Sequence, residues 1–356
     1  MFCIAAFIVL AFISIFSARY RKLAAKAWGC TARRITLRPC DSSFKEEAKN
    51  SLLSHVAKRT PKLVKAADIG IEIASFALVI LTIWSILVVA ESGLNLFVWG
   101  TCTPSNASSC SLGSESCSIS SSKEGFWTLT MKGKPWEWFV NKANDLSNTV
   151  VNIPTRLQKW EANDYLPENA TYYNKYDKSK PTALEIIDSG CIVCAQLFRN
   201  IKQVGFENKY NLTYIVYPIK KPSSNEYQFK NSYTVAKYLE AIKLNSLSNI
   251  NTPADWQILE RIYTWKDSSD VSYQIRLNIN FDENQTVELL QSWLKDIGYS
   301  QEQIKAIEKD ANSKKVVDII SKNKNTVDKE IKTIKIPTII FNDKRHDGLV
   351  ETKDLK

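Results

Sequence analysis

The sequence predicts an α/β domain in its C-terminal half, preceded by two membrane-spanning helices. Two uncharged or nearly uncharged apolar segments lie before residue 91 of the 356-residue chain. From Pro181 onward, β-type and helix-type hydrophobic patterns alternate, with a mostly helical stretch before the last β-type run. The formal net charge of +10 is unevenly placed, because much of the positive charge lies between the two apolar segments.

The two apolar segments predict transmembrane helices at 1–18 and 69–90. Residues 1–18 carry no charged side chain, and a basic cluster follows them directly at Arg19, Arg21, Lys22 and Lys26. A secretory signal peptide carries its charge before the apolar run, so this order favours a retained anchor. Residues 69–90 can cross a hydrocarbon core of ~30 Å at ~1.5 Å per residue. A buried core helix or an inefficient signal is the alternative for 1–18.

The loop at 19–68 is strongly basic, which predicts its location. The positive-inside rule places it in the cytoplasm and places both termini, with the C-terminal domain, on the extracytoplasmic side of the cell membrane. Binding of nucleic acid is the alternative for such a cluster, but topology and anionic headgroups explain a short juxtamembrane cluster better. We therefore expect no nucleic-acid partner.

Cysteine placement agrees with this topology. Six of the eight cysteines fall outside in this arrangement, where disulfides are permitted: Cys3, Cys102, Cys110, Cys117, Cys191 and Cys194. The three in the Ser-rich stretch 101–122 leave one thiol over after an internal pairing, so a bond to Cys3 or to another chain is open. Cys30 and Cys40 lie in the cytoplasmic loop, where they should stay reduced.

Residues 91–180 form a predicted extracytoplasmic linker. Its Ser-rich stretch 101–122 has few apolar side chains and predicts a loop. Pro135 to Val151 predicts an amphipathic helix, with Trp136, Phe139 and further apolar residues at helical spacing. That apolar stripe either lies at the membrane surface or packs on the C-terminal domain.

The domain itself is expected at 181–356. A strand is predicted at Thr182–Asp188, a helix from Cys191 and a second strand at Leu212–Ile219. A helical insertion follows at about 230–325, and a helix over about Lys314–Ile331 leads into a strand after Pro337.

A CxxC pair, Cys191 and Cys194, stands where the first strand passes into its helix. The helix N-terminus favours a thiolate, so Cys191 is the predicted nucleophile. Cys194 lies one turn later and is the predicted resolving thiol, which closes a Cys191–Cys194 redox disulfide.

Resolution requires Cys194 to lose a proton, and Glu185 is the predicted proton carrier. It interrupts a strand that is otherwise apolar, so burial should raise its pKa. The alternative places Glu185 at a strand edge facing water.

With these residues in place, 181–350 resembles the DsbA-like branch of the thioredoxin superfamily, whose members are thiol–disulfide oxidoreductases. The resemblance implies an acidic residue six positions before the first cysteine, which is Glu185, and a cis-proline, which is Pro337. It implies that the backbone of Ile336 pairs with an extended substrate strand. It also implies protein thiol or disulfide substrates, a membrane redox partner that recycles the dithiol, and no cofactor.

Three departures limit that resemblance. Ile192 and Val193 lack the His or Pro found between the cysteines of better-known members. Asp188 adds negative charge that would raise the pKa of Cys191 if it lies near. Little chain follows Val350, so the usual last helix is short or missing.

Two other functions compete with disulfide exchange. A zinc site would need two ligands beyond the CxxC, and the only histidines are His55 and His346, so we expect no metal. A non-catalytic thioredoxin-like module with a static CxxC disulfide would bind extended partners. The function best supported by the sequence is a membrane-anchored extracytoplasmic thiol–disulfide oxidoreductase.

Overall fold

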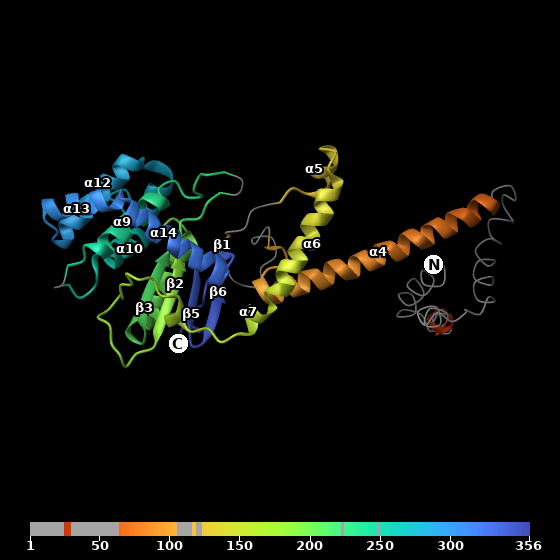
Figure 1. Cartoon of the computed structure of the whole chain (residues 1–356), viewed down its shortest axis with the longest axis horizontal. Helices are drawn as coiled ribbons and strands as arrows, with labels where there is room; N and C mark the ends of the chain where they lie inside the picture. The colour runs from red at the N-terminus through yellow and green to blue at the C-terminus, as the bar shows by residue number, and fades with distance from the viewer. Residues whose placement is uncertain (1–24, 30–63, 105–115, 119–122, 222–223, 248–249) are drawn as a thin grey trace. The chain divides into compact units, whose positions relative to one another are not determined.

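The computed structural model describes residues 25–29, 64–104, 116–118, 123–221, 224–247 and 250–356. The chain forms two compact units, residues 1–91 and 92–356 (Figure 1). The predicted span at 1–18, most of the basic loop, and Cys3, Cys30, Cys40 and Cys110 lie outside the described residues.

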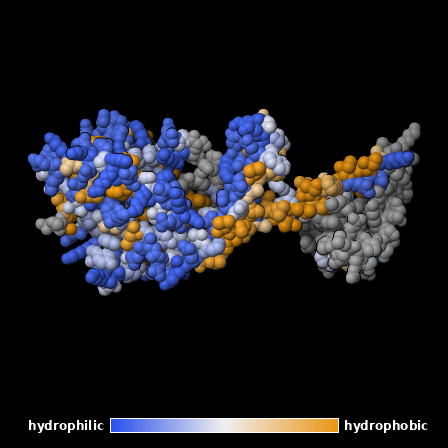
Figure 2. Space-filling view, viewed as in Figure 1, coloured by the Kyte–Doolittle hydropathy of each residue, from blue (hydrophilic) through white to orange (hydrophobic). Residues whose placement is uncertain are grey.

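Helix α4, Val64–Trp99, contains the second predicted span. Its segment Asp68–Trp99 has a mean hydropathy of 2.6 and is long and apolar enough to cross a membrane by length and composition. The side chains along it are mostly exposed, and they form the continuous apolar surface coloured orange in Figure 2. One of the two expected transmembrane helices is therefore present as a candidate in the described chain.

Three short helices follow: α5 at Phe126–Met131, α6 at Pro135–Val151 and α7 at Ile153–Leu157. Helix α6 has the predicted bounds, with its proline in the first turn. The predicted apolar stripe of α6 is exposed, including Trp136 and Phe139. In the described structure this stripe therefore does not pack on the C-terminal domain.

A buried polar contact ties α6 to the last turns of α4. Thr149 Oγ1 accepts a hydrogen bond from Trp99 Nε1 at 3.1 Å and donates one to Asn95 Oδ1 at 2.6 Å. Because these groups are buried, each needs the others as partners. Asn95 Nδ2 also donates to the carbonyl of Cys102 at 3.1 Å, which holds the chain that leaves α4.

The C-terminal domain contains a four-stranded sheet in the order β3-β2-β5-β6. Its strands are β2 at Thr182–Ile187, β3 at Asn211–Val216, β5 at Thr338–Phe341 and β6 at Lys344–Asp347. β2 pairs parallel with β3 and antiparallel with β5, and β5 pairs antiparallel with β6. The strands β2, β3 and β5 are almost wholly buried, which explains why their sequences are mostly apolar.

Helix α8, Ile192–Val204, joins β2 to β3 by the crossover expected between parallel strands. It ends at Gly205, which has φ +66° and so uses the left-handed conformation that glycine favours. After β6, residues 348–356 contain turns and no helix.

Between β3 and β5 lies the predicted helical insertion, which gathers to one side of the sheet in Figure 1. Its helices and helical turns are α9 at Ser232–Leu244, α10 at Ala254–Thr264, α11 at Tyr273–Ile275, η5 at Arg276–Asn280, α12 at Glu283–Ile297, α13 at Gln301–Ala311, α14 at Lys314–Asn325 and η6 at Thr326–Ile331. The predicted capping box at Ser300 and Gln303 is present. Together with the sheet, this insertion confirms the predicted thioredoxin-like α/β fold.

A buried ion pair within α9 contacts a tyrosine of the sheet. Lys243 Nζ lies 3.0 Å from Glu240 Oε1, and both side chains are fully buried. The same ammonium lies 3.9 Å from the ring centroid of Tyr214, on β3. The Tyr214 hydroxyl donates to Asp255 Oδ2 at 2.9 Å, so one cation sits among two acidic residues and an aromatic ring.

Lys243→Met should therefore destabilise the fold strongly, because it leaves Glu240 buried without its cation. We expect a loss of about 3–5 kcal/mol in the free energy of unfolding, measured by urea denaturation of the full chain in detergent. Lys266→Met is the matched control, since the Lys266–Asp270 pair is exposed and such pairs contribute about 1 kcal/mol or less. Equal losses for the two variants would contradict this account.

Candidate functional site

Cys191 lies at the start of α8 and is fully buried. It is the N-cap residue of the helix, and the backbone N–H groups of Cys194 and Ala195 donate to its carbonyl at 3.1 and 3.3 Å. The free N–H groups and positive dipole end of the first turn favour negative charge on a sulfur at this position. This placement is the one that the CxxC spacing predicts.

The sulfur of Cys191 is bonded to Cys117 and not to Cys194. The Cys117–Cys191 disulfide has a Cα–Cα distance of 6.3 Å and joins residues 74 positions apart. Cys194 is a free, buried thiol. In this structure a linker cysteine whose partner was left open, Cys117, is bonded to Cys191, and the predicted Cys191–Cys194 redox disulfide stays a prediction. The reason is tertiary, because a strand from the linker brings Cys117 beside α8.

That strand, β1 at Cys117–Ser118, pairs antiparallel with β4 at Lys335–Ile336. Cys117 faces Ile336 and Ser118 faces Lys335 in the register. The composition of the Ser-rich stretch predicts only a loop. In the structure this stretch also contributes strand β1 to the site. The predicted docking position at Ile336 is occupied by the chain itself.

Pro337 follows β4 with a cis peptide bond to Ile336, as the family resemblance implies. The Ile336 carbonyl oxygen lies 3.7 Å from Cys191 Sγ. Thr338 Oγ1 donates to the carbonyl of Lys335 at 2.7 Å and so holds the chain on both sides of the proline. Cys191, Ile336 and Pro337 are thus brought together from opposite ends of the domain.

Side chains from the helical insertion hold the loop that precedes the CxxC. Tyr263 Oη donates to the carbonyl of Asp188 at 3.1 Å, and Asn278 Nδ2 donates to that of Gly190 at 2.8 Å. Gln274 Nε2 donates to the carbonyls of Ser189 at 2.8 Å and Cys191 at 3.1 Å. The carbonyls of four consecutive residues are therefore positioned by three insertion residues. These three were not identified from the sequence, which offers no local signal that they reach the site.

Glu185 lies on β2 and is only 2% exposed, so the expectation of burial is confirmed and the edge-facing alternative is wrong. Burial raises its pKa from 4.5 to about 8, because the protein interior disfavours the carboxylate. A carboxyl group with such a pKa can both accept and donate a proton near neutral pH.

A second buried carboxyl, Asp188, stands at the end of the same strand. Its Oδ1 accepts from the Gly190 N–H at 2.9 Å and its Oδ2 from the Ile219 N–H at 2.7 Å. Burial raises its pKa from 3.8 to about 7, and these two hydrogen bonds oppose the rise. The sequence placed Asp188 near the cysteines only as a negative charge, whereas the structure makes it a second group that titrates near neutrality.

Burial raises the pKa of the Cys194 thiol well above its ordinary value, and the negative charges of Asp188 and Glu185 raise it further. Cys194 is therefore a weak nucleophile until a base removes its proton. The two carboxyl groups close enough to affect its pKa are the available bases. The site combines a helix-start cysteine in a disulfide, a buried thiol and two buried carboxyl groups.

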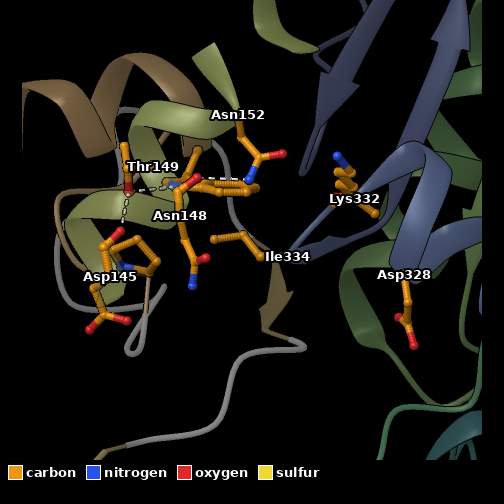
Figure 3. Close-up of a pocket in the computed structure, with 10 residues that line it drawn as sticks. Asp145, Asn148, Thr149, Asn152, Asp328, Lys332 and Ile334 are labelled. Atoms are coloured by element: carbon orange, nitrogen blue, oxygen red, sulfur yellow. Dashed lines mark hydrogen bonds between the residues drawn. The ribbon is translucent and has the colours of Figure 1, made fainter. Parts of the chain in front are cut away.

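A separate pocket of about 570 Å³ lies between α6 and the chain before β4 (Figure 3). Its lining includes polar residues of α6 on one side and residues 328–334 on the other. Two of its charged groups are already engaged, since Asp145 pairs with Lys123 and Asp328 with Lys324. It contains no cysteine, and we assign no chemistry to it. Among the described residues, no three His, Cys, Asp or Glu side chains group as a metal site.

No family model and no curated protein matches the sequence. Among solved structures, the chain is similar to a thioredoxin-like oxidoreductase from Silicibacter pomeroyi DSS-3, with 14% identity, 53% of this chain and 88% of that chain covered, and a TM-score of 0.36. It is similar to the thiol-disulfide exchange protein alpha-DsbA2 from Wolbachia pipientis, with 17% identity, coverages of 51% and 82%, and a TM-score of 0.34. For MdbA, a thiol-disulfide oxidoreductase from Corynebacterium diphtheriae, the identity is 13%, the coverages are 51% and 91%, and the TM-score is 0.37. The fold assignment rests on the strand order, the helical insertion and the place of Pro337.

Gly190 precedes Cys191 in a space that admits no side chain. A Cβ at this position would lie 2.3 Å from Phe229 Cβ and 2.8 Å from Asn278 Oδ1. We expect Gly190→Ala to lower the free energy of unfolding by about 1–3 kcal/mol through overpacking. Gly125→Ala is the control, because nothing lies within 4 Å of its Cβ position. Thermal unfolding of both variants in detergent tests this, and equal melting temperatures would contradict it.

Glu185→Gln should change how stability depends on pH. Between pH 4.5 and about 8 the folded protein keeps a proton on Glu185 that the unfolded chain has released, so stability falls as pH rises. Glu185→Gln has no carboxyl group to titrate, so its free energy of unfolding does not fall in this way. As pH rises through that window, the free energy of unfolding of the variant should increase relative to wild type by up to about 1.4 kcal/mol per pH unit. Urea denaturation of the reduced full chain from pH 5 to 8 measures it. Exposed Glu288→Gln is the control, and parallel pH profiles for Glu185→Gln and wild type would refute the role of burial.

Proposed function

We propose that the C-terminal domain is a thiol–disulfide oxidoreductase that acts on cysteines in extended protein segments. The observation that carries this proposal is the Cys117–Cys191 disulfide, in which a strand paired with Ile336 presents its cysteine to the start of α8. This is the geometry that a mixed disulfide between enzyme and substrate requires. A buried free thiol, Cys194, stands one helical turn away.

In the first step, a substrate strand pairs with β4 and places its sulfur beside Cys191. The Cys191 thiolate, favoured by the N-terminus of α8, attacks one sulfur of a substrate disulfide. A mixed disulfide forms between Cys191 and the substrate, and the other substrate sulfur leaves as a thiolate that takes a proton from solvent. Gln274 and Asn278 keep the attacking residue in place through the carbonyls of Cys191 and Gly190.

In the second step, Cys194 resolves the mixed disulfide. A buried carboxylate, Glu185 or Asp188, accepts the proton of the Cys194 thiol, whose high pKa otherwise prevents attack. The Cys194 thiolate then attacks Cys191 Sγ, which releases the second substrate sulfur and leaves a Cys191–Cys194 disulfide. The substrate has gained two electrons and two protons from the enzyme and solvent, and a membrane redox partner then supplies two electrons that reduce the Cys191–Cys194 disulfide to the dithiol. Oxidation of substrate thiols follows the same steps in reverse.

The proposed location is the extracytoplasmic face of the cell membrane, with two spans. Support comes from the apolar helix segment Asp68–Trp99 and from the basic loop that precedes it. The exposed aromatic stripe of α6 adds to this, because Trp136 and its neighbours have the composition of an interfacial helix. The segment 1–18 would supply the second span.

A non-catalytic thioredoxin-like module is the second candidate. One observation favours it, namely that Cys191 is already bonded and its docking strand already paired. In that case the permanent bond would be Cys117–Cys191 rather than the CxxC disulfide.

A reductase assay with the full chain in detergent separates the two candidates. We expect wild type to accelerate reduction of a peptide disulfide by dithiothreitol, and Cys191→Ser to be at the uncatalysed rate. The double variant Cys117→Ser/Cys194→Ser retains the attacking thiol without either neighbouring thiol, so it should accumulate a mixed disulfide with the peptide, detected by non-reducing mass spectrometry. Equal rates for wild type and Cys191→Ser would sink the enzymatic proposal and favour the binding module.

A further inference from the structure

The docking position of the proposed enzyme is filled by a segment of its own chain. Strand β1 pairs with β4 so that Cys117 faces Ile336, and the Cys117 sulfur is bonded to Cys191. Ile336 is also the residue whose carbonyl oxygen lies 3.7 Å from Cys191 Sγ. Cys117 thus stands where the proposed function places the cysteine of a substrate.

The chain on the N-terminal side of β1 is held at the same strand. We call the described residues 100–104 and 116–118 the start and the end of the tether, which the covalent chain connects. At its start, Lys335 Nζ donates to the carbonyl of Gly100 at 2.8 Å, and Asn95 Nδ2 donates to that of Cys102. At its end, β1 pairs with β4. Both ends of the tether are therefore attached near Lys335, and rupture of the disulfide alone leaves Cys117 nearby.

The contact at Lys335 is unusual for a lysine, because its residue is 1% exposed. Burial lowers the pKa of the ammonium, while the charge of Asp347 opposes this. A buried polar group of this kind requires a partner, and the Gly100 carbonyl supplies one. The start of the tether is therefore held to β4 by the hydrogen bond from buried Lys335 to the Gly100 carbonyl.

We propose that Cys117 is a third redox-active cysteine of this site, an internal thiol that exchanges with Cys194 for the bond to Cys191. This proposal rests on the proposed function, whose nucleophile and resolving thiol it shares. Cys117 occupies the site in competition with substrate cysteines, and the register of β1 specifies how a substrate strand must lie on β4.

The exchange needs no external oxidant or reductant. Cys194 gives its proton to a buried carboxylate, and its thiolate attacks Cys191 Sγ. The bond between Cys191 and Cys117 breaks while the bond between Cys191 and Cys194 forms. Cys117 leaves as a thiolate and takes a proton from solvent, which it can reach because its residue is half-buried. One disulfide and one thiol are present before and after.

The surroundings of Cys194 bear on the rate of this exchange. The groups that face its thiol are Asp188 and Glu185 from β2 and its end, with the Tyr263 hydroxyl from α10 in the same cluster. Their carboxylate forms increase as pH rises through about 7 to 8, and so does the thiolate fraction of Cys194. Opening of the Cys117–Cys191 bond should therefore accelerate with pH across this range.

The proposal also predicts a kinetic effect of the tether. A thiol attached by a short tether competes at an effective concentration on the order of 1 mM. Removal of the Cys117 thiol should lower the KM for a peptide disulfide by about tenfold and leave kcat within about twofold. The reason is that Cys117 then no longer competes with the peptide for Cys191.

Disulfide mapping of the full chain in detergent tests the bond itself. The protein is purified without reductant, its free thiols are alkylated after an acid quench, and its peptides are analysed by mass spectrometry. In wild type we expect a mixture of molecules, some with a Cys117–Cys191 bond and others with a Cys191–Cys194 bond. Cys194→Ser should contain only the Cys117–Cys191 bond, and Cys117→Ser only the Cys191–Cys194 bond. If neither wild type nor Cys194→Ser contains a Cys117–Cys191 bond, the proposal is overturned.

The peptide-reduction assay then tests its consequence, with Cys117→Ser compared with Ser118→Ala. Ser118→Ala keeps the strand and the thiol and should retain the wild-type KM, whereas Cys117→Ser should show the lower one. Turnover with the same KM in wild type and Cys117→Ser overturns the role of Cys117 and leaves the proposed function intact. No turnover in either protein overturns the proposed function, and the proposal on Cys117 falls with it.

Discussion

The approach of the α8 N-terminus to strand β4 is the contact on which the site depends. It brings Cys191 Sγ to 3.7 Å from the carbonyl oxygen of Ile336, a residue 145 positions later in the chain. The sheet makes this possible, because β2 delivers the cysteine and the neighbouring antiparallel strand β5 begins directly after Pro337. The Cys117–Cys191 disulfide and the pairing of β1 with β4 lie at that approach.

The helical insertion has a direct part in this arrangement. Tyr263, Gln274 and Asn278 donate hydrogen bonds to the carbonyls of residues 188–191, so the loop before the CxxC is held by side chains of the insertion. The insertion in turn contacts β3 at Tyr214, whose ring lies beside the Lys243 ammonium and whose hydroxyl donates to Asp255. Stability of the insertion and geometry of the cysteines are therefore coupled through short polar contacts.

Electrostatics of the site are dominated by burial rather than by ion pairing. Glu185 lies within the buried strand β2 and Asp188 follows its last residue, and burial raises the pKa of Glu185 to about 8 and that of Asp188 to about 7. Both carboxyl groups also disfavour the thiolate of Cys194. In the proposed mechanism, attack by Cys194 therefore requires transfer of its proton to one of these carboxylates.

The sequence by itself determined the elements whose signals are local: the strand carrying Glu185, the helix that starts at Cys191, helix α6, and the proline before the last strands. Each depends on periodicity, on a cap or on spacing within a few residues. Only the tertiary structure decided the partner of Cys191, the residues that hold its loop, and the second carboxyl at Asp188. A disulfide between residues 74 positions apart follows from how strands lie beside one another, and no local pattern around Cys117 encodes the facing residue Ile336.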